Sequence, residues 1–251
     1  MNPKSQPRRL VIIWAALAAL AFGSGAAWAR GDTVKGNGAM TQETRALGNF
    51  KGIALGVPAQ VEVRMGNVES VTIDTDANIL PLVETVVEKG TLHIRPARRN
   101  LSLQPRTLKV VVQARQIGHL AIGGGGSIKA AALKAPKLDL DIGGAGSIDV
   151  SGLESEAVAT AVGGSGDVKL GGTTRKLTVS IGGSGDVKAG QLKAEDVNVN
   201  IGGSGDVTVW AAKSLSAAIA GSGDIDYWGD PQVTTAIVGA GHTRRLGPAP
   251  R

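Results

Sequence analysis

A glycine-rich turn that recurs at a nearly constant interval is the feature of this chain that most limits its possible folds. The turn reads GGGGSI, GGAGSI, then GGSGDV three times, then AGSGDI, and a degraded VGAGHT ends the series. One apolar residue precedes each turn, at spacings of 20, 20, 19, 20, 18 and 18 residues: Ile122, Ile142, Val162, Ile181, Ile201, Ile219 and Ile237. Such a period indicates a repeat architecture, in which each unit packs mainly on its neighbours.

Each turn follows a short segment in which apolar and polar residues alternate, most clearly at residues 138–142, 177–181 and 197–201. A second, shorter alternating segment follows each turn. Strict alternation predicts a β-strand with one buried face. A unit of 18 to 20 residues cannot bury that face alone, so equivalent strands must stack in parallel about 4.8 Å apart. We therefore predict an all-β fold, a parallel β-solenoid with about seven coils over residues 116–246.

The same geometry explains the glycines, which would give sharp corners their positive φ angles and let the backbones of neighbouring coils pack closely. Each coil would hold two or three short strands. The absence of hexapeptide repeats favours a right-handed winding.

Residues 45–115 lack the glycine period and carry longer strand patterns, and Glu88-Lys89-Gly90 between two of them is typical of a hairpin turn. We predict a partly antiparallel β-sheet that caps the start of the solenoid, so that residues 45–246 form one elongated domain. Residues 30–44 are polar and contain glycine, which predicts a flexible lead, and residues 247–251 a loose tail.

The first 29 residues have the three parts of a secretory signal peptide. Lys4, Arg8 and Arg9 form its basic start, residues 10–22 its apolar centre, and Ala27-Trp28-Ala29 a cleavage site. We expect Sec-dependent export, cleavage after Ala29 and a periplasmic, secreted or cell-surface protein with no remaining membrane span. An uncleaved membrane anchor is the alternative.

Charge and cysteine content exclude some classes of function. Cleavage would lower the excess of basic over acidic side chains from six to three, so nucleic-acid binding loses its support from composition. The chain contains no cysteine, which excludes disulfides, thiol catalysis and cysteine-ligated metals.

Further short motifs lie in the N-terminal half of the chain. They are Phe50-Lys51-Gly52-Ile53, Val61-Glu62-Val63 with Gly66, Asn78-Ile79-Leu80, and Lys89-Gly90-Thr91-Leu92-His93-Ile94, together with the GSGDV turns. With these motifs the sequence resembles the head GIN domain, the auto-transporter adhesin family of exported bacterial proteins, over roughly residues 45–245. The resemblance implies a β-helical head outside the cytoplasm and offers no catalytic residues.

The last coils carry three aromatic residues, Trp210, Tyr227 and Trp228. Trp210 and Trp228 occupy equivalent positions in successive coils, so their rings could form a platform for the apolar face of a sugar. The alternative is an aromatic cap over the last coils.

An acidic residue follows the last glycine of four successive turns: Asp167, Asp186, Asp206 and Asp224. Carboxylates stacked about 4.8 Å apart repel each other by roughly 1 kcal/mol. Lys169 and Lys188, and hydrogen bonds from corner N–H groups, are expected to offset this repulsion. Asp206, Asp224 and Asp226 lack such lysines, and we interpret them as an uncompensated cluster that could bind Ca²⁺. No other cofactor is expected.

Basic residues gather around the segment from residue 96 to 106, namely Arg95, Arg98, Arg99 and Arg106, with Lys109 and Arg115 after it. Arginine suits bidentate contact with phosphate, so this segment could bind an anionic polymer. A solvated charged loop is the alternative.

No nucleophile–base pair is recognisable, because His93, His119 and His242 are scattered and the turns are not nucleophile elbows. We expect a non-enzymatic, adhesin-like surface protein that presents its repetitive flank to a glycan, an envelope polymer or a protein. Two alternatives stay open: a polysaccharide lyase or hydrolase on a β-helix, and an architectural or assembly protein of the cell envelope.

Overall fold

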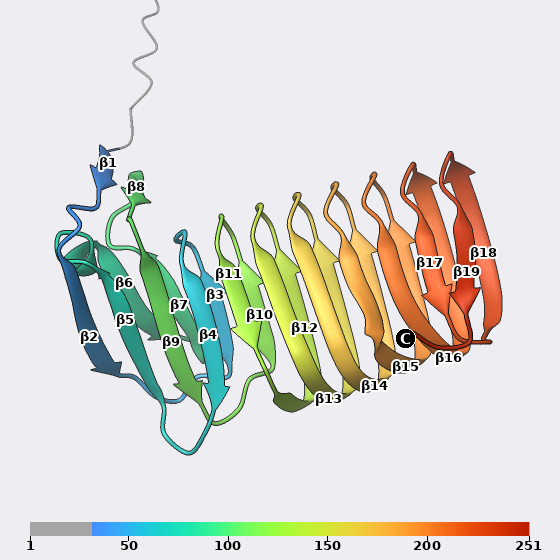
Figure 1. Cartoon of the computed structure of the whole chain (residues 1–251), viewed down its shortest axis with the longest axis horizontal. Helices are drawn as coiled ribbons and strands as arrows, with labels where there is room; N and C mark the ends of the chain where they lie inside the picture. Colours follow the sequence, from blue (N-terminus) through green and yellow to red (C-terminus); the bar gives the residue numbers. More distant parts are fainter. Residues whose placement is uncertain (1–31, 251) are drawn as a thin grey trace, which may run out of the picture. The chain divides into compact units, whose positions relative to one another are not determined.

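The computed structural model describes residues 32–250, which form a solenoid built almost entirely of β-strands (Figure 1). The predicted signal peptide, residues 1–29, lies outside the described residues. Among residues 32–250 the single helical element is a 3₁₀ turn, Leu80–Leu82, and no helix there is long and apolar enough to cross a membrane.

The strands fall into an N-terminal group and a repeat group. The N-terminal strands are β1 (Asp32–Lys35), β2 (Met40–Ala46), β3 (Gly52–Leu55), β4 (Gln60–Met65), β5 (Ser70–Asp76), β6 (Val83–Glu88), β7 (Thr91–Pro96), β8 (Leu101–Gln104) and β9 (Leu108–Ala114). The repeat strands are β10 (His119–Ile122), β11 (Ser127–Ala130), β12 (Leu133–Ile142), β13 (Ser147–Val162), β14 (Asp167–Ile181), β15 (Val187–Ile201), β16 (Val207–Gly221), β17 (Ile225–Trp228), β18 (Gln232–Gly239) and β19 (Thr243–Gly247).

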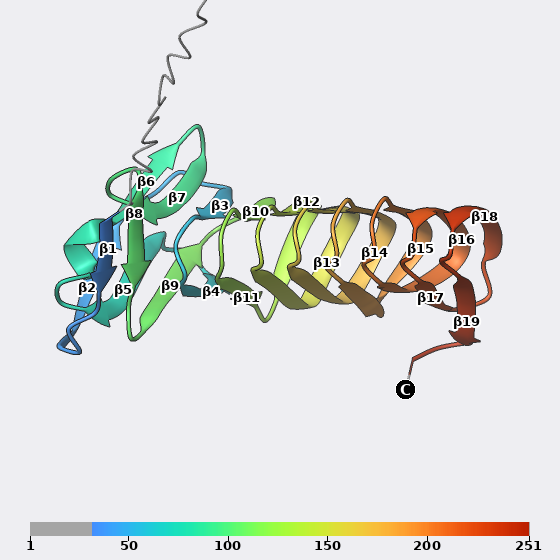
Figure 2. The same ribbon diagram turned by 90° about the horizontal axis from the view of Figure 1, so that it is seen from above.

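The repeat strands stack in parallel and in register, as the glycine period predicts. The apolar residues before the turns form one column, in which each pairs with the next: Ile122, Ile142, Val162, Ile181, Ile201, Ile219 and Ile237. These seven rungs, joined by about six complete turns, are visible side by side in Figure 2. The prediction of a β-solenoid is confirmed, and its right-handed winding stays a prediction.

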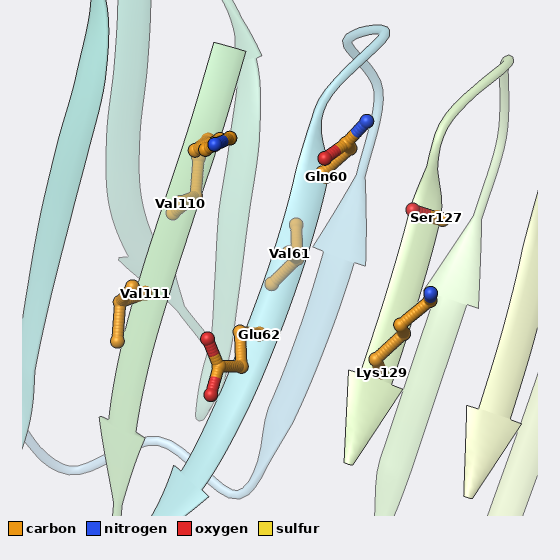
Figure 3. A pocket seen from close by; sticks show the side chains of 8 residues that line it. Gln60, Val61, Glu62, Val110, Val111, Ser127 and Lys129 are labelled. Carbon is orange, nitrogen blue, oxygen red and sulfur yellow. The ribbon is translucent and has the colours of Figure 1, made fainter.

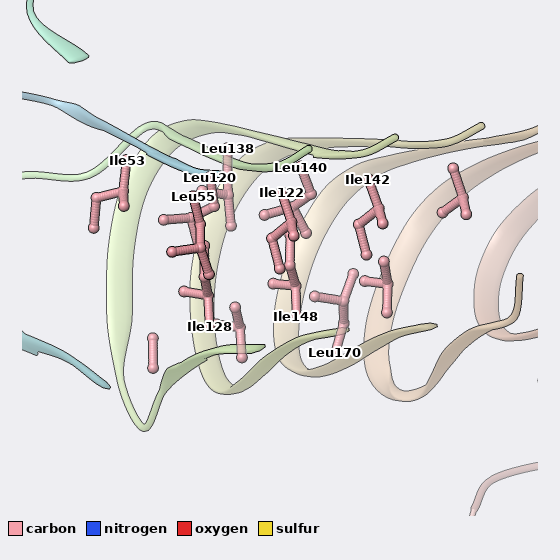
Figure 4. Packing of buried hydrophobic residues seen from close by; sticks show 14 of the residues in the cluster. Ile53, Leu55, Leu120, Ile122, Ile128, Leu138, Leu140, Ile142, Ile148 and Leu170 are labelled. Carbon is pink, nitrogen blue, oxygen red and sulfur yellow. The ribbon is translucent and has the colours of Figure 1, made fainter. Parts of the chain in front are cut away.

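The core lies between the strand before each turn and the strand after it. Leu120 and Leu140 come from the strands before the turn and Ile128 and Ile148 from the strands after it, and Figure 4 shows all four pointing into the same interior. Each is at most 1% exposed. Because aliphatic side chains of one coil cover those of the next, the core continues along the whole stack.

The turn glycines are needed mainly because the turns of neighbouring coils touch. A Cβ atom on Gly183 would meet the carbonyl oxygen of Gly164 in the preceding coil, and the same collision recurs along the column. The Ser184 N–H donates to that carbonyl oxygen at 3.0 Å. Only Gly126 and Gly239 of the turn glycines have a positive φ. The expectation of close backbone packing is confirmed, whereas the expectation that most of these turns need positive φ is wrong.

The N-terminal region is partly antiparallel, as predicted. Strand β5 pairs antiparallel with β2 and β9, and β6 with β7. Lys89 and Gly90, with φ of 50° and 78°, form the predicted hairpin between β6 and β7. These strands close the N-terminal end of the stack.

Strands β3 and β4 form a rung that lies out of chain order. Strand β3 pairs in parallel with β7 on one side and β10 on the other, and β4 pairs likewise with β9 and β11. Residues 52–65 are therefore inserted between two segments that follow them in the sequence (Figure 1).

The predicted flexible lead is wrong for residues 32–44, which are held in two strands. Strand β1 pairs in parallel with β8, and β2 pairs with β5. Between them, the buried Asp76 carboxylate accepts the backbone N–H groups of Gly38 at 2.6 Å and Arg106 at 2.8 Å. At the other end, β19 ends at Gly247 and residues 248–250 lie outside any strand.

Burial acts to raise the pKa of Asp76, but the hydrogen bonds from Arg106 and Gly38 outweigh it and hold that pKa below its ordinary value. The carboxylate therefore stays ionised in the cap, where two backbone donors converge on it.

Candidate binding surfaces

The two tryptophans lie on neighbouring rungs, as their equivalent positions predict. Trp210 in β16 is the register partner of Trp228 in β17, and both side chains are half-buried. The Lys193 Nζ lies 5.5 Å from the centre of the Trp210 ring, within the range of a cation–π contact.

The indole of Trp228 lies along the stack. Its Nε1 is 3.5 Å from the place that a Cβ on Gly190 would take, and its Cζ3 is 3.1 Å from the corresponding place on Gly247. The lack of a side chain at Gly190 and at Gly247 therefore leaves room for the Trp228 ring, which reaches towards the coils on both sides of it.

Tyr227 does not join the two tryptophans. Its register partner is the fully buried Val209, and its side chain packs against the hydrophobic core. Successive residues of a strand face opposite sides, so Tyr227 covers the core end while Trp228 lies outside it. The cap interpretation thus fits Tyr227, and a sugar platform of Trp210 and Trp228 stays a prediction.

The stacked aspartates are bridged by the backbone, which confirms the expected role of corner N–H groups. Oδ1 of Asp186 accepts the Asp206 N–H at 3.1 Å, and Oδ1 of Asp206 accepts the Asp224 N–H at 2.9 Å. The same contact recurs from Asp167 to the N–H of Asp186 at 3.4 Å and from Asp224 to that of His242 at 2.8 Å. Each carboxylate thus receives a donor from the following coil, which offsets the repulsion along the column.

The description of Asp226 as uncompensated is wrong, whereas Asp206 has no cationic partner among residues 32–250. Arg244 donates to both carboxylate oxygens of Asp226, from Nε at 2.9 Å and from Nη2 at 2.7 Å. Arg244 follows His242 by two residues, the position that Lys169 and Lys188 hold in earlier coils, so the sequence contained this signal. Among the described residues no three His, Asp or Glu side chains are placed to hold a metal ion.

The four arginines do not form one site. Arg95 is bound by Glu84 and Glu88, each at 2.7 Å. Arg95 nevertheless lines a hollow of about 720 Å³ together with Arg98 and Arg99, which are exposed. Arg106 lies at the other end of β8, where its backbone N–H binds Asp76. Proximity in sequence was misleading here because β8 separates the two ends of this segment.

The structure contains a groove that the sequence patterns did not indicate. Figure 3 shows its first part, a hollow of about 380 Å³ over β9, β4 and β11. A second hollow of about 440 Å³ is also lined by Glu62 and Lys129, so the two lie side by side, and together we call them the β4 groove. Its polar lining comprises Gln60, Glu62, Arg64, Lys109, Ser127, Lys129, Asp149 and Ser151. These residues meet only because β4 is inserted between β9 and β11.

The family described as "Putative auto-transporter adhesin, head GIN domain" matches residues 49–231. The chain belongs to this family. The matched part of the head GIN domain begins just before Phe50 and ends just before β18, so it includes the inserted rung, the β4 groove and both tryptophans.

Solved structures share the fold of this head GIN domain. A putative adhesin from Bacteroides fragilis superposes with a TM-score of 0.81 at 23% identity, covering 85% of this chain and 100% of that one. A putative lipid binding protein from Parabacteroides distasonis gives 0.73 at 24% identity, covering 86% and 100%. A putative adhesin from Parabacteroides merdae gives 0.68 at 20% identity, covering 86% and 99%. No curated protein matches the chain. The family and the fold support an adhesin-like surface protein.

Proposed function

We propose that this head GIN domain is an exported, adhesin-like binding protein without catalytic activity, and that its ligand is a glycan. The observation that carries the proposal is the register pairing of Trp210 with Trp228 on the outside of the solenoid. Parallel stacking sets the two backbones about 4.8 Å apart, so the two tryptophans already lie on neighbouring rungs before a ligand arrives. Aromatic rings with a polar edge suit a ligand that has apolar faces and hydroxyl edges.

The proposal is tested on a glycan array with the wild type and a Trp210→Ala, Trp228→Ala double variant. We expect the variant to bind the wild type's ligand at least tenfold more weakly, because loss of about 0.7 kcal/mol per ring amounts to that factor. A Thr178→Ala, Asn198→Ala double variant, which truncates half-buried side chains of other strands, should bind as the wild type does. Equal binding by the tryptophan variant would reject the platform.

An assembly role is the second candidate, and the state of β18 favours it. All eight residues of this strand are exposed, although Val233 and Ile237 continue the interior columns of Leu215 and Ile219. Val233 is 39% and Ile237 42% exposed, whereas their partners are at most 1% exposed. A strand with a free edge and exposed apolar side chains can pair with a second copy of the chain.

A further inference from the structure

The β4 groove contains two lysines that face a shared hollow and form no ion pair within residues 32–250. Lys109 comes from β9 and Lys129 from β11, and β4 lies between them, so their strands are about 10 Å apart. Across residues 32–250, no carboxylate oxygen lies within 4.0 Å of either ammonium group. Both ammonium groups are therefore available to a ligand.

The one carboxylate between these lysines is already engaged. Glu62 accepts two hydrogen bonds from Arg64, at 2.7 Å from Nε and 3.0 Å from Nη2. The Arg64 hydrogen bond holds the pKa of Glu62 below its ordinary value, against the smaller effect of burial. Glu62 and Arg64 thus neutralise each other, so the net charge of the first hollow comes from Lys109 and Lys129, while Asp149 lies in the second hollow.

The remaining lining of the first hollow also provides hydrogen-bond donors. The Gln60 amide and the Ser127 hydroxyl lie on adjacent strands at its upper end (Figure 3). The backbone groups of β9, β4 and β11 are used in pairing with one another, so a ligand meets side chains only. Such a surface suits a ligand covered with hydroxyl groups and negative charge, rather than a peptide that must satisfy its own backbone.

We propose that the β4 groove binds an acidic polysaccharide, with Lys109 and Lys129 contacting its carboxylate or sulfate groups. The groove follows β4 from Gln60 to Met65, about 17 Å at the rise of a strand, which favours a segment of polymer over a single small anion. This inference rests on the proposed function in taking the ligand to be a glycan, but it uses a different surface from the tryptophans.

Titration calorimetry with polygalacturonate, and with dextran as the uncharged probe, tests the groove. A Lys109→Gln, Lys129→Gln double variant should bind polygalacturonate at least tenfold more weakly. Glu62→Gln should bind it about fivefold more tightly, because the substitution removes a negative charge and frees Arg64. Lys176→Gln, which removes one exposed lysine elsewhere on the solenoid, controls for the loss of a surface positive charge and should bind as the wild type does. Circular dichroism checks that each variant is folded.

Several results would overturn the proposal that the β4 groove binds an acidic polysaccharide. They are dextran binding equal to that of polygalacturonate, an unchanged double-lysine variant, an equal loss in Lys176→Gln, or weaker binding by Glu62→Gln. Equal or tighter binding of poly-glutamate would assign the groove to an acidic peptide instead. If the tryptophan variant loses its glycan while the lysine variant keeps all binding, the proposed function stands and the groove fails. If only the lysine variant loses binding, the groove stands and the tryptophan platform fails.

Discussion

At the scale of single residues, the close approach of neighbouring turns limits which residue types the turns can contain. Gly182 and Gly183 are adjacent in one GGSGDV turn, but their surroundings differ. A Cβ on Gly182 would have no atom within 4 Å, whereas one on Gly183 would meet the Gly164 carbonyl oxygen. Backbone cannot move aside as a flexible side chain can, so only the second position strictly requires glycine.

We therefore expect Gly183→Ala to lower the free energy of unfolding by about 1–3 kcal/mol through overpacking. Gly182→Ala should change that free energy by no more than about 0.5 kcal/mol, because the position is exposed and has no positive φ. Urea denaturation followed by circular dichroism measures both. Equal effects of the two substitutions on the free energy of unfolding would show that contact between the turns does not require glycine at position 183.

At the scale of elements, the N-terminal cap depends on one buried carboxylate. Asp76 holds β1 and β2 indirectly, because its oxygens bind the segment between them and the segment that follows β8. Asn78 adds a bond from its side-chain nitrogen to the Lys35 carbonyl oxygen at 2.8 Å. Residues 32–44 are thus held by pairing with β8 and β5 and by polar contacts to Asp76 and Asn78, and Val34 packs against the core.

Replacing Asp76 by Asn should destabilise the cap at neutral pH. The amide nitrogen of the new side chain would face a backbone N–H group and could not accept a hydrogen bond from it. The wild-type pKa is lowered, so the carboxylate's contribution is present above its unfolded pKa of about 4 and is lost as the pH falls through the lower folded pKa. The free energy of unfolding, measured from pH 7 to pH 2, should fall less steeply below pH 4 in Asp76→Asn than in the wild type.

Asp74→Asn provides the control for this pH dependence. Asp74 lies on the same strand, and its carboxylate makes no hydrogen bond within the described part of the chain. The free energy of unfolding of Asp74→Asn should change with pH as that of the wild type does. A wild-type profile in Asp76→Asn would contradict the role given to the Asp76 carboxylate.

The sequence predicted those elements whose evidence is local or periodic. The column from Ile122 to Ile237 follows from spacing alone, and the hairpin at Lys89-Gly90 follows from its turn residues. The insertion of β3 and β4 was not predictable in this way, because alternation at residues 60–65 indicates a strand but not its neighbours. The β4 groove depends on that insertion and was missed with it. The Asp226–Arg244 pair was missed although its spacing repeats that of earlier coils.

At the scale of the whole molecule, the two ends of the stack are closed differently. Antiparallel strands cover the N-terminal end, whereas within residues 32–250 β18 at the other end is paired only with β16 and exposes Ile237. The family match ends before β18, so the exposed rung lies outside the part of the chain that defines the family.

If β18 mediates assembly, sedimentation velocity should show self-association that increases with protein concentration. Ile237→Lys should shift the protein towards monomer, because a charge would enter the exposed interior column. Val238→Lys is the matched control, since this residue of the same strand is 78% exposed and lies outside that column. A monomeric wild type at all concentrations would reject the assembly role.

Because β3 and β4 lie out of chain order, their position affects the order in which strands can pair while the chain is being synthesised. A chain made from its N-terminus delivers residues 52–65 early, yet their neighbours on both sides, β7 with β9 and β10 with β11, come later. One side of this rung can pair once residue 114 has emerged, whereas its other side stays open until residue 130 has emerged. The later coils can then add one by one, each on the coil synthesised just before it.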